Sequence, residues 1–378
     1  MRILLVTREF PPDIGGISTY CGEIARAAGQ LGYEVDVVAP WGGGGRRRSQ
    51  MFDDGFDVYG FTGSDSPARD IVSLVWRVWD RLRVKRYDTV HACDKYGQIA
   101  LWLVGKGGEV RSCATIYGTD VTRWRYSGFH RHVDVWAYGY ARRVAAISKY
   151  TLGQFEDMLR GRSKRPLARA IPLAISECWF REYRSRSLWE RLPDRFVIGT
   201  VGRLVPRKGH KSVIAACSRL SDSLRRRLTY VVVGSGDAQL LEEIRCEAAK
   251  ARVDFVHVDN ATREDLVLLY RQMDVHVLFA QPFRHTVEGF GLVVLEAGSQ
   301  RVPTIASDLG GIPEVIEHGY SGLLIKNEEE LASRLSELAD DRIRRAELGE
   351  GAYERARRRS WLDVARETYG FFALSGSD

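Results

Sequence analysis

Short apolar runs alternate with segments of helical periodicity along the first half of the chain. Runs of strand length occupy residues 2–7, 34–40, 89–92, 111–117 and 144–148. Apolar positions recur at helical spacing in residues 17–31 and 74–85. Strands that alternate with helices form a parallel sheet with helices on both faces, so this half is predicted to be a doubly wound α/β domain.

The same alternation starts again near residue 196 and predicts a second sheet of the nucleotide-binding type. Its expected strands are residues 196–201, 230–233, 253–258, 275–279 and 304–306. The polar, arginine-rich and weakly periodic segment 181–194 is the expected domain boundary, and 361–372 is an expected amphipathic helix. The predicted domains are therefore residues 1–180 and 195–355, followed by a C-terminal helix within 356–378.

Length and composition agree with two soluble domains. At 378 residues the chain exceeds the size at which one hydrophobic core stops growing. No apolar run approaches the roughly eighteen residues of a transmembrane helix, and the apolar N-terminus is too short for a signal peptide. The six cysteines are scattered without a C-x-x-C pair, which argues against a zinc site or a disulfide framework. We therefore expect a cytoplasmic protein.

A formal charge of +7 favours anionic partners, which include phosphate-bearing substrates, acidic membrane surfaces and nucleic acid. No helix-turn-helix, zinc-finger or aromatic RNA-binding motif is present, so nucleic acid is not a predicted partner. Part of the charge lies in residues 42–48, where four glycines followed by three arginines predict a flexible basic loop.

Glycine turns follow several of the expected strands. Gly15 and Gly16 precede the first helix, where free amides and the helix dipole favour a negative charge. Gly234 and Gly236 follow a strand of the second half, at the sheet edge where ligands bind in open α/β sheets. A plain structural turn explains Gly15 and Gly16 at least as well in isolation, and no dinucleotide fingerprint or Walker A motif is present.

Residues 202–209 form a basic turn directly after the first strand of the second domain. Arg203 and Lys208 can converge on a diphosphate there, with a planar fork of donors from arginine and a compact charge from lysine. A solvated basic turn is the alternative.

Two glutamates, Glu288 and Glu296, enclose seven uncharged residues. The first adjoins a loop with Gly289 and Gly291, and the second follows the apolar opening of a helix. Carboxylates in apolar surroundings need partners, and sugar hydroxyls can donate hydrogen bonds to them. The alternative is one solvated glutamate in a loop and another on a helix.

The chain resembles the retaining nucleotide-sugar glycosyltransferases of family 4, because four motifs occur in the order found in that family. They are the basic turn, Gly-Ser-Gly, Glu-x7-Glu and the Gly-Gly-Ile-Pro-Glu of residues 310–314. The resemblance covers almost the whole chain and is densest in residues 199–325. It implies a GT-B fold, in which two Rossmann-like doubly wound parallel-sheet domains face a central cleft. It also implies that the final helix crosses back onto the N-terminal domain, which binds the acceptor.

The resemblance implies a role for each motif. Glu288 contacts the donor sugar's hydroxyls and Glu296 holds the ribose, while Arg203 and Lys208 grip the diphosphate. Backbone contacts to sugar and phosphate come from Phe290, Gly291 and Leu292. The glycines of the binding loops are Gly15, Gly16, Gly202, Gly234 and Gly236.

Two segments depart from the family pattern. Many relatives carry His-Gly at the end of an N-domain strand, whereas this chain has Tyr117-Gly118. Tyrosine can donate a hydrogen bond to a sugar hydroxyl but is a poor base at neutral pH. A core tyrosine is the alternative, and His91 on a neighbouring strand is another candidate. The usual Pro-Asn-Gly-Ile-Asp is replaced at 172–176 by Pro-Leu-Ala-Ile-Ser.

The implied reaction moves a hexose from a UDP- or GDP-linked donor to an acceptor hydroxyl with retention of configuration. The leaving phosphate accepts the acceptor's proton. No D-x-D motif follows a strand, so we expect no metal and no cofactor beyond the donor substrate. A lipid-linked or saccharide acceptor is expected, as in envelope polysaccharide or glycolipid assembly. The alternatives are a synthase with a soluble acceptor and a non-catalytic sugar-nucleotide-binding protein.

An N-domain helix combines basic residues with Trp76 and Trp79, a composition that suits anionic lipid headgroups. We expect a peripheral protein on the inner face of the cell membrane, although a solvated helix face is the alternative. The basic residues in this interpretation are Arg77, Arg81, Arg83, Lys85, Arg86, Arg123, Arg125, Arg131, Arg142 and Arg143.

Overall fold

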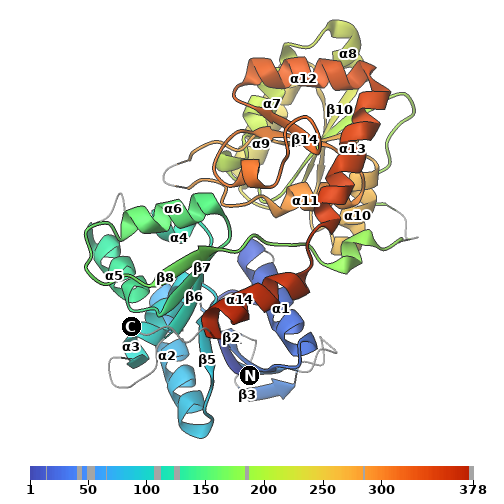
Figure 1. Ribbon diagram of the computed structural model, residues 1–378. Coiled ribbons are helices and arrows are strands. Elements are labelled where there is room, and N and C mark those ends of the chain that lie inside the picture. The colour runs from blue at the N-terminus through green and yellow to red at the C-terminus, as the bar shows by residue number, and fades with distance from the viewer. Residues whose placement is uncertain are drawn as a thin grey trace. The chain divides into compact units, whose positions relative to one another are not determined.

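The computed structural model of the chain divides into two compact units (Figure 1). It describes residues 1–13, 15–40, 45–48, 56–64, 66–105, 112–122, 128–183, 187–283 and 286–373. The first unit takes the chain up to Leu173 together with the residues from Trp361 on, and the second unit takes Ala174–Ser360. Each unit is described by itself.

Eight strands form one sheet among the described residues of the first unit, in the order β3-β4-β2-β1-β5-β6-β7-β8. In chain order they are β1 (Arg2–Val6), β2 (Glu34–Pro40), β3 (Gly45–Arg48), β4 (Asp57–Phe61), β5 (Thr89–Ala92), β6 (Ser112–Ile116), β7 (Arg143–Ala146) and β8 (Leu167–Ala170). All pairs are parallel except β3 with β4.

The antiparallel strand β3 corrects the prediction of a flexible loop over residues 42–48. Residues 45–48 pair in register with β4, so the three arginines lie on an edge strand. Residues 42–44 lie outside the described part of the chain. The polar composition hid the strand because an edge strand gains its order from the backbone of its neighbour rather than from an apolar face.

Helices cover both faces of this sheet. They are α1 (Gly16–Gln30), α2 (Pro67–Val84), α3 (Lys95–Gly105), α4 (Thr119–Thr122), α5 (Gly128–Gly139), α6 (Lys149–Met158) and α14 (Trp361–Ala373). Val90 and Ala92 of β5 join the core that contains residues of α2, α3, α5 and α6. Successive strand side chains point to opposite faces, so His91 between them faces the other side, where α14 lies beside α1 (Figure 1).

Helix α14 is held on the sheet by polar contacts as well as by apolar packing. Arg143 of β7 is 2% exposed and donates through its guanidinium to the carbonyl of Phe371 at 2.9 Å. The expectation that Arg143 belongs to a basic surface is therefore wrong. It lies inside the unit because the helix end offers it unpaired carbonyl groups.

The second unit contains six parallel strands in its described residues, in the order β11-β10-β9-β12-β13-β14. They are β9 (Phe196–Val201), β10 (Leu228–Val233), β11 (Asp254–Val258), β12 (Val275–Leu278), β13 (Thr304–Ser307) and β14 (Gly322–Ile325). Its α-helices are α7 (His210–Ser218), α8 (Asp222–Arg227), α9 (Ala238–Ala251), α10 (Arg263–Arg271), α11 (Leu292–Ser299), α12 (Glu328–Asp340) and α13 (Arg342–Arg357). The strand order reverses between β9 and β12, so the loops that follow these two strands meet at one edge.

The chain enters the second unit after Leu173, before the segment 181–194 in which the boundary was expected. The short 3-10 turn η2 (Glu177–Phe180) accounts for this. The ring of Trp179 packs edge-on against Tyr270 with 6.2 Å between ring centroids, and its carbonyl accepts a hydrogen bond from Gln300. The polar composition of residues 181–194 indicated only the later part of the segment that connects the two units. Within the described ranges, none of the helices combines the length and apolar character needed to cross a bilayer.

Candidate functional site

The predicted basic turn begins where β9 ends. Gly202 has a φ of 141° and donates its amide to the carbonyl of Val233 at 2.9 Å. The chain then forms the 3-10 turn η3 (Pro206–Lys208). Gly209 follows in the left-handed conformation, with a φ of 68°, and is the N-cap of α7. A Cβ on Gly209 would overlap the carbonyl oxygen of Phe279. The missing side chain therefore allows the basic turn to lie directly against the end of β12.

The loop after β12 is clipped to the same turn. Gln281 donates its backbone amide to the carbonyl of Arg207 at 3.0 Å and its side-chain amide to that of Pro206 at 2.9 Å. Farther along, the carbonyl of Glu288 accepts a hydrogen bond from the amide of Gly311 at 3.0 Å. The predicted Gly310-Gly311 turn thus supports the Glu288 loop.

Glu288 forms ion pairs with two cations of the basic turn. Lys208 Nζ lies 3.0 Å from Glu288 Oε2, and an Arg207 nitrogen lies 2.5 Å from the same oxygen. The three side chains are only 8–17% exposed. Burial by itself raises the pKa of Glu288, but the charges of Lys208 and Arg207 outweigh it and lower the pKa to about 2. Glu288 is therefore ionised at neutral pH.

Arg207 is the member of this cluster that sequence reasoning missed. Arg203 and Lys208 were expected to act together, but Arg203 is exposed and no described residue pairs with its guanidinium. Basic residues at 203, 207 and 208 are visible in the sequence. Which of them meets Glu288 depends on how the loop after β12 packs, and no local pattern reports that.

Glu296 lies in the second turn of α11 and has a different environment. Tyr270 donates a hydrogen bond to Glu296 Oε2 at 3.2 Å. Burial raises the pKa of Glu296 to about 7, although the tyrosine hydroxyl and the charges of Arg263 and Lys208 act in the lowering direction. Close to pH 7 the carboxyl group therefore exchanges between its neutral and ionised forms.

The three residues predicted to offer backbone contacts lie at the start of α11. The side chain of Phe290 is buried, Gly291 is the N-cap with a φ of 93°, and Leu292 is the first helical residue. Amides at a helix N-terminus favour an anionic group. Glu288 and Glu296 flank this helix start on either side in the sequence.

Gly234 and Gly236 serve the packing of one loop on another. A Cβ on Gly234 would overlap the carbonyl oxygen of Gly202, and one on Gly236 would overlap that of Leu204. The amide of Leu204 donates to the carbonyl of Ser235 at 2.9 Å. The two glycines thus bring the loop after β10 onto the basic turn.

In the first unit, Gly15 caps α1 and Gly16 is its first residue. No described atom lies within 4 Å of the place where a Cβ of Gly16 would stand. Packing therefore does not require a glycine at position 16, in contrast to position 209. This openness is compatible with a ligand that approaches the backbone.

Tyr117 follows β6, and its half-buried ring packs edge-on against Tyr20 with 5.4 Å between centroids. Burial raises the pKa of Tyr117 well above its usual value, so its phenol can donate a hydrogen bond but is not a base. His91 is fully buried, with Nε2 2.8 Å from the Thr115 hydroxyl and Nδ1 3.3 Å from that of Tyr369. Burial lowers the pKa of His91 to about 3, and the residue serves the packing of α14.

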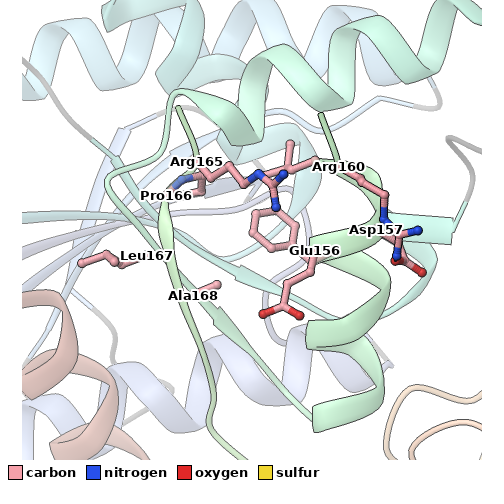
Figure 2. A pocket seen from close by; sticks show the side chains of 9 residues that line it. Glu156, Asp157, Arg160, Arg165, Pro166, Leu167 and Ala168 are labelled. Carbon is pink, nitrogen blue, oxygen red and sulfur yellow. The ribbon is translucent and has the colours of Figure 1, made fainter. Parts of the chain in front are cut away.

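A surface hollow of about 390 Å³ lies between α6 and β8 in the first unit (Figure 2). Figure 2 shows Glu156, Asp157, Arg160 and Arg165 around it. Arg160 forms an ion pair with Asp157 at 2.5 Å. The hollow includes none of the predicted site residues, and the described residues contain no cluster of three His, Cys, Asp or Glu side chains suited to a metal ion.

Two family models match successive parts of the chain. Residues 14–166 match the family model Glycosyltransferase Family 4, and residues 185–355 match that of Glycosyl transferases group 1. The GDP-mannose-dependent alpha-(1-6)-phosphatidylinositol monomannoside mannosyltransferase of Mycobacterium tuberculosis is 30% identical in an alignment of 381 positions that covers 93% of each chain.

Solved structures with the same fold span nearly the whole chain. Sucrose-phosphate synthase from Thermosynechococcus elongatus superposes with a TM-score of 0.80 at 18% identity and covers 98% of each chain. The Anabaena protein HepE, crystallised with UDP-glucose, has a TM-score of 0.75 at 20% identity and covers 98% of this chain and 99% of its own.

The two Rossmann-like parallel-sheet units have the GT-B fold of these structures, and the family models and the mycobacterial relative show a glycosyltransferase, as the motifs predicted. The chain belongs to the family 4 glycosyltransferases, the group 1 glycosyl transferases.

Alanine at two glycine positions should have opposite effects. In Gly311→Ala the new Cβ overlaps the backbone oxygen of Gly289, which cannot move aside as a flexible side chain does. We expect a loss of about 1–3 kcal/mol of unfolding free energy. Gly16→Ala meets open space in a helix and should be neutral or more stable by about 0.5–1 kcal/mol. Urea unfolding measures both, and a Gly311→Ala protein as stable as wild type would contradict the packing argument.

The pKa of Glu296 predicts how stability depends on pH. Because folding raises this pKa from 4.5 to about 7, the protonated carboxyl stabilises the fold. The contribution is complete below about pH 4.5, is lost as the pH rises through 7, and amounts to at most about 3 kcal/mol. Glu296→Gln imitates the protonated form, so its unfolding free energy should fall less than that of wild type between pH 5 and pH 8.

Urea unfolding at several pH values tests this expectation. Glu264→Gln removes an exposed carboxylate of the same unit and is the matched control, expected to keep the wild-type slope. Equal slopes for wild type and Glu296→Gln would show that burial does not hold the Glu296 proton.

Proposed function

We propose that this enzyme is a retaining hexosyltransferase that moves a hexose from a nucleoside-diphosphate sugar to a hydroxyl of a lipid-linked or saccharide acceptor. Its place would be envelope polysaccharide or glycolipid synthesis on the cytoplasmic side of the membrane. The observation that supports this best is the pairing of Glu288 with Lys208 at the point where the strand order reverses. It puts an acceptor of sugar hydroxyl protons beside a cation for the diphosphate.

In the proposed donor complex each part of the second unit binds one part of the ligand. Lys208 and Arg203 hold the diphosphate, the carboxylate of Glu288 accepts from sugar hydroxyls, and Glu296 accepts from the ribose. The amides at the start of α11 and the loops of Gly202, Gly234 and Gly236 surround the phosphates. UDP and GDP donors both fit the proposal, because one named relative uses GDP-mannose and one fold neighbour was crystallised with UDP-glucose.

The proposed step is a front-face displacement. The bond between the sugar C1 and the phosphate oxygen breaks while the acceptor oxygen bonds to C1 from the same face, and the leaving phosphate takes the acceptor's proton. Lys208 and Arg203 stabilise the charge that develops on the phosphate, a task that a metal ion performs in other enzymes. Glu288, with two cations on one oxygen and a pKa of about 2, is a weak nucleophile. This supports a mechanism without a covalent sugar–enzyme intermediate.

In the first unit, Gly15 and Gly16 would close over donor and acceptor. Tyr117 would donate a hydrogen bond to a hydroxyl of the transferred sugar, since its raised pKa excludes the role of base. No cofactor and no nucleic acid take part in this proposal.

Lys208→Ala tests the diphosphate site. Loss of one electrostatic contact to the developing charge should lower turnover about 100- to 1,000-fold. Sugar transfer and donor hydrolysis are measured with GDP-mannose and UDP-glucose, each with and without EDTA, and EDTA should have no effect. Near-normal turnover in Lys208→Ala would overturn the assignment. Efficient transfer to a soluble glucan would favour a synthase, and donor binding without hydrolysis or transfer would favour a binding protein.

The proposed membrane contact is one face of α2. Val72, Trp76 and Trp79 recur at helical spacing and are 69%, 55% and 48% exposed. Arginine guanidinium groups lie over both tryptophan rings, Arg77 at 4.8 Å and Arg83 at 4.4 Å from the ring centroids. Tryptophan beside arginine suits the headgroup layer of an anionic membrane.

The structure also reduces the predicted basic set. Lys85 is engaged by Glu34 and Asp36, both at 2.8 Å, and Arg81 lies over the ring of Tyr59. The side chains of Arg123, Arg125 and Arg131 lie outside the described part of the chain, while Arg86 and Arg142 are exposed.

Replacement of both Trp76 and Trp79 by alanine should weaken binding to vesicles of anionic phospholipid. The loss of two interfacial side chains removes both the apolar contact and the platform for two arginines. Vesicle sedimentation at low and high salt measures the effect. Trp136→Ala removes an equally exposed tryptophan (55%) from α5 and is the matched control. The contact would be refuted if wild type failed to bind anionic vesicles at low salt or if both variants bound alike.

A further inference from the structure

Two cations, Arg207 and Lys208, share one oxygen of Glu288. We propose that Arg207 is a positioning residue that holds Glu288 in place while Lys208 turns from this carboxylate to the donor diphosphate. The inference rests on the proposed function, because it takes Glu288 to face the donor sugar. It adds Arg207 to the proposed donor site, and it adds a binding step in which Lys208 exchanges Glu288 for the diphosphate.

The geometry gives Arg207 and Lys208 different freedom. The backbone of Arg207 accepts a hydrogen bond from Gln281, and Gln281 also holds the preceding carbonyl of Pro206. Gln281 belongs to the same loop as Glu288, so Arg207 is tied to the loop whose carboxylate it contacts. In the proposal, both ends of the Arg207–Glu288 contact therefore stay together when the donor binds.

Lys208 is directed toward the phosphate side of the site. Its Cε and Nζ lie 3.2 and 3.5 Å from the position that a Cβ of Gly202 would occupy. Its ammonium thus spans the space between the turn at the end of β9 and Glu288. A short rotation of the flexible side chain exchanges the carboxylate for an anion at that turn, beside the exposed Arg203.

The charges of the cluster agree with this exchange. Arg203, Arg207 and Lys208 carry three positive charges and Glu288 one negative charge. The remaining two match the two negative charges of a diphosphate esterified at both ends. Without Arg207, the two positive charges of Arg203 and Lys208 would face three negative charges, one from Glu288 and two from the diphosphate.

Both cations bind Oε2, and no described residue donates a hydrogen bond to Oε1 of Glu288. Oε1 is therefore the oxygen left for a sugar hydroxyl. When Lys208 leaves, Arg207 still orients the carboxylate so that Oε1 keeps its direction. Arg207 acts on the sugar only through Glu288.

A double-mutant cycle of Arg207→Gln and Glu288→Gln tests the inference. Turnover is measured with a panel of UDP and GDP sugars, and binding of free UDP and GDP is measured by calorimetry. Arg207→Gln should lower kcat about 100-fold, the cost of a misplaced contact group. The same change in the Glu288→Gln background should have almost no further effect. Arg207→Lys keeps the charge without the planar fork, so its kcat should lie between those of wild type and Arg207→Gln. This variant also allows the test if the glutamine variant does not fold.

Binding of UDP and GDP distinguishes a positioning residue from a phosphate ligand. Arg207→Gln should weaken it less than about fivefold, since a charge that does not touch the phosphates contributes little, whereas Lys208→Gln should abolish it. Arg219→Gln, which removes an exposed arginine that pairs with Glu329 at 2.9 Å, is the control and should match wild type.

Two results would overturn the role of Arg207 while wild type remains active. One is a loss of kcat in Arg207→Gln that is fully additive with that of Glu288→Gln. The other is a loss of UDP and GDP binding as large as in Lys208→Gln. Failure of wild type itself to bind either nucleotide and to transfer sugar would instead overturn the proposed function.

Discussion

The ion pairs of Glu288 with Arg207 and Lys208 join two loops that lie about eighty residues apart in the sequence. A carboxylate that is largely removed from water is costly unless cations compensate it. Here the compensation comes from a turn after β9, and the carboxylate comes from the loop after β12. The reversal of strand order between these two strands brings the loops together. The rest of the candidate donor site is arranged around this contact.

The glycines of the site allow the loops to approach one another. Side chains at Gly209, Gly234 and Gly311 would each overlap a backbone oxygen of a neighbouring loop. Such positions are demanded by the fold before any ligand arrives, because two backbones can lie this close only without a Cβ between them. Gly16 differs, since no described atom is near its missing side chain. Packing therefore explains the glycines at 209, 234 and 311 but not the one at 16, and the sequence does not distinguish the two cases.

Glu288 and Glu296 show how environment separates two carboxyl groups on either side of one helix start. Both are largely buried, which favours the neutral form. Two adjacent cations reverse that preference for Glu288 and bring its pKa to about 2, whereas Glu296 has a tyrosine hydroxyl and more distant cations and reaches about 7. The first is a permanent anion suited to fixed hydrogen bonds with hydroxyls. The second changes its charge near neutral pH, and the proposed ribose contact would then depend on pH.

The amino-acid sequence by itself determined the fold class, because the alternation of apolar strands and amphipathic helices is local and survives in each segment. It also located the motifs of the second unit, since each follows a strand. It missed β3, whose order depends on β4, and it counted Arg143 as a surface residue, although the end of α14 supplies its partners. It named Lys208 as a cation of the donor site but not Arg207, and it did not predict that both pair with Glu288. Those outcomes were decided by the tertiary structure, because the partners come from segments distant in sequence and their contacts depend on how loops and helices pack.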